Sequence, residues 1–248
     1  MTQTHTVIDR YLAAWNETDP GARRRRIEAL WAPGGASLNR TLEARGADAL
    51  FARVTGANDK WVRDGGFEFR PASIQAHSEV IRCAWEMGPR GTGEVESRAQ
   101  SFLVLDDEGR ILCDYQFPMQ APEDAPDVTA LARAYVAFWN ETDAAARAEM
   151  AGRLWSPRGE HADAHGRQRG LDAILAEAGL AAAAYAARDR PFVQDGPADG
   201  HNGAVRLDWT AGSGEARESG QSLLLLDGAG RIDRAYTFED ARVAVPAE

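Results

Sequence analysis

Cysteine and lysine are scarce in this chain of 248 residues. It contains two cysteines, Cys83 and Cys113, and a single lysine, Lys60. Two cysteines are too few for the disulfide framework of a small secreted domain, so they favour a reducing compartment. The sequence also lacks an apolar run long enough to cross a bilayer, and no apolar signal segment precedes Val7. We therefore expect a cytoplasmic protein with no membrane partner.

Basic residues are also fewer than acidic ones. The formal net charge is −10, and residues 1–124 and 125–248 are both acidic. Binding to a nucleic-acid backbone relies on Lys and Arg side chains that neutralise phosphates, so we expect no nucleic-acid partner. The run Arg23–Arg26 is the exception, but residues 147–150, at the corresponding place in the second half, do not keep its charge. We interpret this run as the solvated face of a helix.

The chain repeats itself. Residues 11–19 are YLAAWNETD, and residues 135–143 are YVAFWNETD, at an offset of 124 positions. After a deletion of three residues, SFLVLDDEGRI at 101–111 returns as SLLLLDGAGRI at 222–232. A period of this length is the size of a domain and too long for a solenoid repeat. Every candidate residue therefore has a counterpart with which it can be compared.

The repeat predicts two domains. We place the first copy at residues 1–119 and the second at residues 129–242. The segment between them, residues 120–128, is rich in proline and acidic residues and is predicted to be a linker. The hydrophobic fraction of 44% is that of an ordinary globular protein, so each copy can bury a core.

Each copy begins with patterns typical of helices. Apolar residues from Val7 to Trp15 recur at helical spacing and predict an amphipathic helix that ends near Asn16. Asp19 before Pro20 predicts the N-cap of a second helix, and residues 48–56 predict a third. The remainder of the copy alternates as strands do, with glycine-rich turns. The second copy shows the same order.

Helices followed by an antiparallel meander indicate the α+β class. We expect two fused cone-shaped α+β barrel domains, each with three N-terminal helices packed in a curved antiparallel sheet. A sheet that curves around helices leaves a conical cavity, which is a natural place for a small ligand.

Four strings that occur in both copies carry a family resemblance: YxAxWNETD, LW followed by Ala-Pro or Ser-Pro, RGxDA and LDxxGRI. Together they resemble the nuclear transport factor 2-like superfamily and, within it, the SnoaL-like bacterial branch. The resemblance covers nearly the whole chain, twice. It implies the cone fold, which hosts polyketide cyclases, ketosteroid isomerases, epoxide hydrolases, dehydratases and plain ligand binders. The family usually forms dimers through its sheet, so a tandem chain implies an internal pseudo-dimer, with a further homodimer left open.

The resemblance also implies a site in the second copy. Asp163 and His165 match family positions that carry an acidic residue and a histidine near the cavity mouth. Desolvation in an apolar cone raises the pKa of a carboxylate, so Asp163 is a candidate general base. His165 would orient it or shuttle a proton, and Tyr135 would donate a hydrogen bond to the developing oxyanion. On this hypothesis Asp163→Asn abolishes turnover. The alternative is an ordinary turn over 163–166.

The first copy differs at these positions. Asn39 stands at the place of Asp163, and Thr41 at the place of His165. Asn39 cannot act as a base, although its amide can donate a hydrogen bond to an oxyanion. The two cavities are therefore not equivalent, and the sequence favours the second for acid-base chemistry.

The string His161-Asp163-His165 also has the alternation that would place three metal ligands on one face of a strand. Zinc or iron could bind such a set. A single H-x-D-x-H string is a weak signal, however, and here it falls in a segment expected to turn. We expect no metal and no other cofactor.

Paired aromatic residues are the remaining candidates for ligand contact. Residues expected to line the cavities, and so to bind substrate, are Tyr11, Trp15, Asn39, Trp61, Trp85, Trp139 and Trp209. The alternative for the aromatic residues is that they form the shared core. Trp61 has no aromatic counterpart and is a candidate lid.

The sequence predicts a cofactor-independent enzyme of bacterial secondary metabolism that acts on a small apolar carbonyl or epoxide substrate. It would be a cyclase, isomerase or dehydratase that uses acid-base chemistry in an apolar cavity. The alternatives are a non-catalytic small-molecule binder, an epoxide-opening hydrolase or cyclase, and a structural interaction module.

Overall fold

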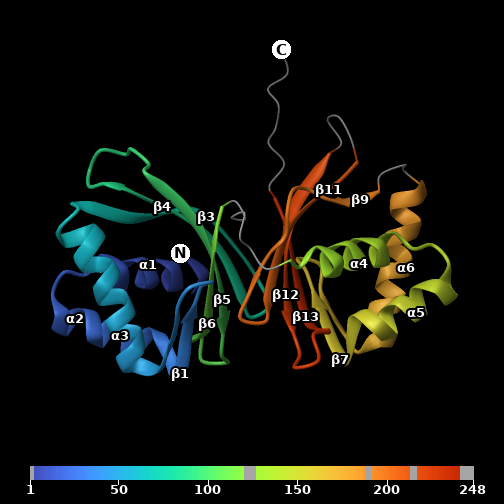
Figure 1. Cartoon of the computed structure of the whole chain (residues 1–248), viewed down its shortest axis with the longest axis horizontal. Coiled ribbons are helices and arrows are strands. Elements are labelled where there is room, and N and C mark those ends of the chain that lie inside the picture. The colour runs from blue at the N-terminus through green and yellow to red at the C-terminus, as the bar shows by residue number, and fades with distance from the viewer. Residues whose placement is uncertain (1–2, 120–126, 188–190, 213–216, 241–248) are drawn as a thin grey trace, which may run out of the picture. The chain divides into compact units, whose positions relative to one another are not determined.

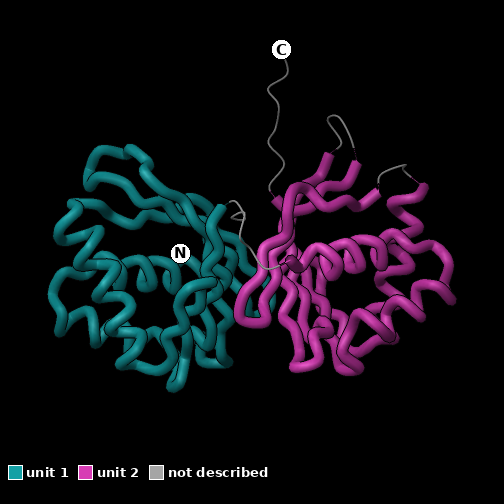
Figure 2. Tube along the Cα trace, viewed as in Figure 1, with its two compact units in different colours: residues 1–120 teal, residues 121–248 magenta. Residues whose placement is uncertain are grey.

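The structure, a computed structural model, describes residues 3–119, 127–187, 191–212 and 217–240. The chain divides into two compact units, residues 1–120 and residues 121–248 (Figure 2). Most of the linker predicted at 120–128 and the predicted end of the second domain at residue 242 lie outside the described residues.

Unit 1 has helices α1, α2 and α3, followed by a short π-helical segment, η1. These helical elements are α1 (Gln3–Asn16), α2 (Pro20–Leu30), α3 (Gly46–Ala57) and η1 (Asn58–Arg63). The strands are β1 (Trp31–Leu38), β2 (Glu43–Arg45), β3 (Phe67–His77), β4 (Val80–Pro89), β5 (Ser97–Leu105) and β6 (Ile111–Pro118). Figure 1 shows α1 enclosed between the curved sheet and helices α2 and α3. The α+β class and the three N-terminal helices predicted from the sequence are confirmed.

The sheet of unit 1 has the strand order β2-β1-β6-β5-β4-β3. Strands β3 to β6 form the predicted antiparallel meander. Strand β1, however, pairs with β6 in parallel, so the sheet is mixed and the expectation of a wholly antiparallel sheet was wrong. The two strands are far apart in the sequence, and no hairpin between them sets their relative direction.

Unit 2 repeats this plan, with a single longer helix in place of α3 and η1 and with one change in its sheet. Its helices are α4 (Thr129–Asn140), α5 (Ala144–Leu154) and α6 (Leu171–Ala187). Its strands are β7 (Trp155–Ala162), β8 (Arg167–Arg169), β9 (Phe192–Gln194), β10 (Asp199–His201), β11 (Ala204–Ala211), β12 (Glu218–Leu226) and β13 (Ile232–Glu239). Strand β7 pairs with β13 in parallel, as β1 does with β6. The change lies at the sheet edge, where β9 and β10 both pair with β11 in the place that β3 takes beside β4.

The repeated asparagine of the WNETD string fastens the first helix of each unit to its sheet. Asn16 donates from Nδ2 to the Phe69 carbonyl at 2.8 Å and accepts from the Phe69 amide at 2.9 Å. Asn140 makes the same two contacts with Phe192, at 2.6 and 2.9 Å. The side-chain amide of each asparagine thus makes the two backbone hydrogen bonds that a neighbouring strand would make with one residue. This structural role explains why the string occurs in both units, and it involves no ligand.

The repeated aspartate of the same string starts the second helix. The Asp19 carboxylate accepts from the Ala22 amide at 2.6 Å, and the Asp143 carboxylate accepts from the Ala146 amide at 2.8 Å. Both aspartates have extended backbone and occupy the N-cap, as predicted for Asp19. The WNETD string therefore connects the first two helices of each unit and binds the first helix to a strand.

Arg23 corrects the interpretation of the basic run as a solvated face. Its side chain is only 1% exposed. Nε donates to the Glu17 carbonyl at 2.9 Å, Nη1 to Thr55 Oγ1 at 2.9 Å and Nη2 to Asn58 Oδ1 at 2.6 Å. Arg25 and Arg26 are exposed, as expected. One arginine of the run thus joins α2 to the end of α3 and the start of η1.

We expect Arg23→Met to lower the free energy of unfolding of unit 1 by about 2 kcal/mol or more, because three acceptors, one fully buried and two partly buried, lose their donor. The exposed neighbour provides a control: Arg25→Met should change it by less than about 0.5 kcal/mol. Urea denaturation followed by tryptophan fluorescence measures both. Equal effects of the two substitutions would contradict a structural role for Arg23.

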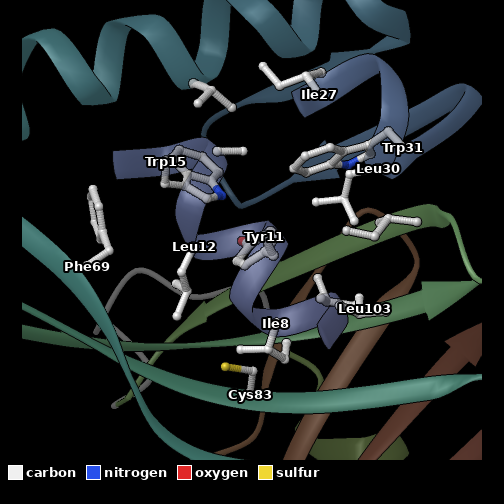
Figure 3. Close-up of a cluster of buried hydrophobic side chains, with 14 of the residues drawn as sticks. Ile8, Tyr11, Leu12, Trp15, Ile27, Leu30, Trp31, Phe69, Cys83 and Leu103 are labelled. Carbon is white, nitrogen blue, oxygen red and sulfur yellow. The ribbon is translucent and has the colours of Figure 1, made fainter. Parts of the chain in front are cut away.

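Each unit has its own hydrophobic core, and the core of unit 1 is centred on α1. Figure 3 shows Ile8, Tyr11, Leu12 and Trp15 extending from this helix, with Phe69 across from Trp15. Tyr11 is 1% exposed, and its ring centroid lies 6.0 Å from that of Trp15. Within the described part of the chain, no helix combines the length and the apolar composition that crossing a membrane requires.

Candidate functional site

The structure corrects the expectation of a desolvated base at Asp163. The Asp163 carboxylate accepts hydrogen bonds from the backbone amides of His165 at 2.8 Å and Gly166 at 2.9 Å. The Asp163 amide in turn donates to the Gly166 carbonyl, which closes the turn. The His165 side chain is 79% exposed, and its Nε2 lies 3.8 Å from Glu239 Oε1. This geometry is that of the turn hypothesis, and it does not bring the two side chains together in a cavity.

The other residues of the proposed second site lie in the core of unit 2. Tyr135 is buried, and its hydroxyl is 3.2 Å from Thr237 Oγ1. Trp139 and Trp209 are also buried. The His161 ring packs 4.6 Å from the Trp139 ring, and its Nδ1 lies 3.0 Å from an amide oxygen of Gln168. His161 therefore points into the core, whereas Asp163 and His165 lie in the turn.

Asn39 also has a turn role. Its Oδ1 accepts from the Thr41 amide at 3.0 Å and the Leu42 amide at 2.8 Å. It does not line the cavity described next. The corresponding residues Asn39 and Asp163 thus both cap the turn after the first strand of their unit, which is why an amide and a carboxylate are interchangeable there.

Unit 1 contains an aromatic cavity of about 170 Å³ between α1, α3, η1 and the sheet. Residues that line it include Tyr11, Trp15, Trp61, Phe69, Trp85 and Gln116. Four of the residues predicted to bind substrate, Tyr11, Trp15, Trp61 and Trp85, are thus brought together. Among the described lining residues, Arg53 alone is charged.

A buried carboxylate lies behind this lining. Asp114, on β6, is 0% exposed. Its Oδ2 accepts from the Tyr11 hydroxyl at 2.8 Å, from Gln116 Nε2 at 2.8 Å and from Ser37 Oγ at 3.2 Å. Its Oδ1 is also buried and has no hydrogen-bond partner among the described residues. Three donors thus converge on one oxygen, and the other oxygen is unsatisfied.

Burial has the largest effect on the pKa of Asp114. It raises the pKa of Asp114 to about 6, although the hydrogen bonds from Tyr11, Gln116, Ser101 and Ser37 act in the opposite direction. The pKa of Tyr11 is raised well above its usual value of 10.0, first by burial and then by the nearby Asp114 carboxylate. Tyr11 is therefore a protonated donor at every physiological pH, and Asp114 can take up a proton near neutrality.

The Gln116 amide is oriented from both sides. Its Nε2 donates to Asp114 Oδ2 and, at 3.0 Å, to the Tyr11 oxygen. Its Oε1 accepts from Arg53 Nη2 at 3.1 Å. Exchanging the nitrogen and the oxygen would place a donor against a donor and an oxygen against a carboxylate, so only one orientation fits. Gln116 also lines the cavity, and it therefore connects the cavity with the carboxylate.

Unit 2 has no carboxylate at the corresponding position. The residue opposite Ser37 on β6 is Asp114, whereas the residue opposite His161 on β13 is Ala235. The position of Gln116 is taken by Thr237, whose hydroxyl lies within hydrogen-bond distance of Tyr135, His161 and Ser222. The buried carboxylate of this network therefore lies in unit 1, whereas the sequence favoured the second copy for acid-base chemistry.

Sequence reasoning missed Asp114, although a signal was present. Asp114 and Gln116 are two positions apart on a predicted strand, so they share a face, and the second copy has Ala235 and Thr237 there. Asp and Gln in one copy, in place of Ala and Thr in the other, form a difference between the inner faces of the two sheets that comparison of the copies could detect.

No protein-family model matches the chain, and no curated protein does. Solved structures do match about half of it. A candidate isomerase of the SnoaL-like family from Agrobacterium tumefaciens is 28% identical, with 48% of this chain and 98% of that chain covered and a TM-score of 0.43. A candidate polyketide cyclase from Sinorhizobium meliloti is 14% identical, with 47% and 100% covered and a TM-score of 0.37. A candidate ketosteroid isomerase from Kribbella flavida is 16% identical, with 50% and 86% covered and a TM-score of 0.38. The chain is similar to the SnoaL-like proteins that its sequence resembles.

Proposed function

We propose that unit 1 is a cofactor-independent isomerase or cyclase that transfers a proton on a small, largely apolar carbonyl compound. The observation that carries the proposal is the buried Asp114 carboxylate, hydrogen-bonded by Tyr11 behind an aromatic cavity. A general base is most effective when its pKa lies near the operating pH, and that of Asp114 is about 6. The tryptophan and phenylalanine rings of the lining favour an apolar occupant.

Tyr11 connects the carboxylate with the cavity. Its hydroxyl donates to Asp114 Oδ2, and its oxygen accepts from Gln116 Nε2 on the cavity side. A ligand that takes the place of the Gln116 amide on Tyr11 contacts the hydroxyl directly and has Asp114 one hydrogen bond behind it. Under this proposal Tyr11 is the residue that touches the substrate, and Asp114 holds the proton.

The proton transfer balances without a cofactor. A hydrogen on the carbon beside the substrate carbonyl passes to the Tyr11 oxygen as the Tyr11 hydroxyl proton passes to Asp114 Oδ2. The substrate becomes an enolate, and the carboxylate becomes neutral. Return of the proton through Tyr11 to a different carbon completes an isomerisation. In a cyclisation the enolate carbon attacks a second carbonyl of the same molecule, and the alkoxide that forms takes the proton back from Asp114 through the Tyr11 hydroxyl.

Binding without chemistry is the second candidate. The observation in its favour is that Asp114 does not line the cavity and is covered by Tyr11 and Gln116. A site of this kind would use the aromatic rings for affinity and the polar network for orientation.

Deuterium exchange distinguishes the two candidates. The full chain is incubated in D₂O with a panel of monocyclic ketones, and deuterium at the carbons beside the carbonyl is measured by mass spectrometry. The proposed activity predicts incorporation well above the buffer rate for at least one ketone. Ketones that bind, as judged by tryptophan fluorescence, but incorporate deuterium only at the buffer rate would favour the binder.

A further inference from the structure

We propose that Arg53 recognises a carboxylate on the ligand, and that the ligands of unit 1 are therefore small monocyclic carboxylates. This inference rests on the proposed function in that both use the same cavity, although binding an anion requires no proton transfer. The inference adds that the ligand is negatively charged, and Arg53 is the one charged residue among the described residues that line the cavity.

The Arg53 guanidinium lies in the cavity without a counter-charge. It is held over the Trp15 ring, with 5.2 Å between Cζ and the ring centroid, and Nη2 donates to Gln116 Oε1. Among the described residues it forms no ion pair, and its buried Nε has no acceptor. Arg24 and Arg63, on neighbouring helical segments, do pair with carboxylates, each with a contact of 2.8 Å.

The chemistry of the guanidinium identifies the missing partner. Its planar fork of five N–H groups matches a carboxylate in bidentate fashion, and one N–H is used by the neutral amide oxygen of Gln116. The Asp114 carboxylate cannot serve as that partner, because Gln116 stands between it and Arg53. The Gln116 oxygen accepts one hydrogen bond but leaves the charge of the guanidinium uncompensated, whereas a ligand carboxylate would accept two parallel N–H groups and neutralise that charge, so it is the preferred occupant.

The size of the cavity sets the size of the ligand. Its volume of about 170 Å³ is close to that of an engineered apolar cavity of about 150 Å³ that binds benzene. Trp15, Trp61 and Trp85 offer ring faces and edges for a single ring of this size. The combination of one ring site and one unpaired guanidinium points to a monocyclic carboxylate.

Unit 2 provides an internal comparison. The residue that corresponds to Arg53, at the offset of 124 positions, is Glu177 on α6. The charge at this helix position is thus reversed in the unit that has also lost the Asp114 carboxylate. The guanidinium and the buried carboxylate occur together in one unit, as expected if both serve one ligand.

The test compares benzoate with benzamide, which has nearly the same shape but no charge. Affinities are measured by isothermal titration calorimetry on the full chain and on the variants Arg53→Met, Arg53→Gln and Glu177→Gln. In the wild type we expect benzoate to bind at least about tenfold more tightly than benzamide, the ratio that a charge-assisted hydrogen bond supplies. Arg53→Met keeps an unbranched apolar chain over Trp15 and should abolish this ratio while benzamide affinity changes by less than about twofold. Glu177→Gln should leave the ratio unchanged.

Equal affinity for the two probes in the wild type would overturn the inference, as would a ratio that survives in Arg53→Met or, if that variant does not fold, in Arg53→Gln. Absence of binding by either probe at millimolar concentration would overturn it as well. The outcome is separable from that of the proposed function. A protein that prefers benzoate, and that binds ketones without incorporating deuterium into them, supports anion recognition and contradicts proton transfer.

Discussion

Replacing Asp114 by Asn should lower the rate of deuterium incorporation by about 10²- to 10⁴-fold, the usual contribution of a general base. The substitution keeps the shape of the side chain and its ability to accept a hydrogen bond from Tyr11. It removes the group that stores the proton, because an amide oxygen is far too weakly basic. The measurement is the rate of label uptake by the ketone that the wild type labels fastest.

Asp163→Asn in unit 2 is the matched control. The same chemical change is made there in a turn, where Asn39 already fills the corresponding place in unit 1. We expect Asp163→Asn to leave the exchange rate within about twofold of the wild type, since the Asp163 carboxylate accepts from the backbone amides of a turn. Loss of exchange in Asp163→Asn with retention in Asp114→Asn would reverse the assignment of the two units and restore the site expected from the sequence.

The stability of unit 1 should depend on pH through Asp114. The carboxyl has its usual pKa of 3.8 in the unfolded chain and a pKa of about 6 in the folded protein. Between these values the folded state binds more protons, so the free energy of unfolding falls as the pH rises from about 4 to about 6. The difference corresponds to about 3 kcal/mol. The cost of burying the ionised group is absent below this window and complete above it.

Asp114→Asn isolates this contribution. The variant should lose the fall in stability between pH 4 and pH 6, so that the difference between the two proteins changes by about 3 kcal/mol across the window. Tyr11 and Cys83 face the carboxylate, but burial raises the pKa of both, that of Cys83 to about 12, and neither titrates here. Hydrogen-deuterium exchange of peptides from β5 and β6, corrected for the intrinsic effect of pH, reports unit 1 alone. Parallel curves for the two proteins would show that Asp114 has an ordinary pKa.

The helices and the duplication could be predicted because their determinants are local. Asp19 caps a helix through an amide three residues away, and the apolar spacing in α1 depends on one helix alone. The meander was predictable for the same reason, since tight turns join its strands. Two copies of each pattern removed most of the ambiguity that a single copy leaves.

The parallel pairing of β1 with β6 could not be predicted in this way, and the site depends on it. Ser37 and Asp114 become neighbours through that pairing, across 77 positions of sequence. Arg23 shows the same limit on a helix, because its partners Thr55 and Asn58 belong to later elements. Burial of a polar side chain is a property of the assembled fold, and a charged residue gives no local sign of it.

The choice of Asp163 over Asp114 illustrates this limit. The family resemblance pointed to Asp163, and Asp114 was not among the residues predicted to form the site. The backbone amides of the turn satisfy Asp163, whereas one oxygen of Asp114 is buried with no partner among the described residues. Comparison of the copies marks Asp114 as a position that differs, but its burial is established only by the three-dimensional structure.

Titration of the Asp114 carboxyl by carbon-13 NMR determines whether unit 1 holds a buried acid with a raised pKa. The signal is assigned by its absence from Asp114→Asn, and its chemical shift is followed between pH 3 and pH 8. A midpoint of about 6 is the predicted result, which would show that unit 1 holds a buried acid able to exchange protons near neutrality. A midpoint at or below 4, the value of an ordinary exposed aspartate, would contradict the account.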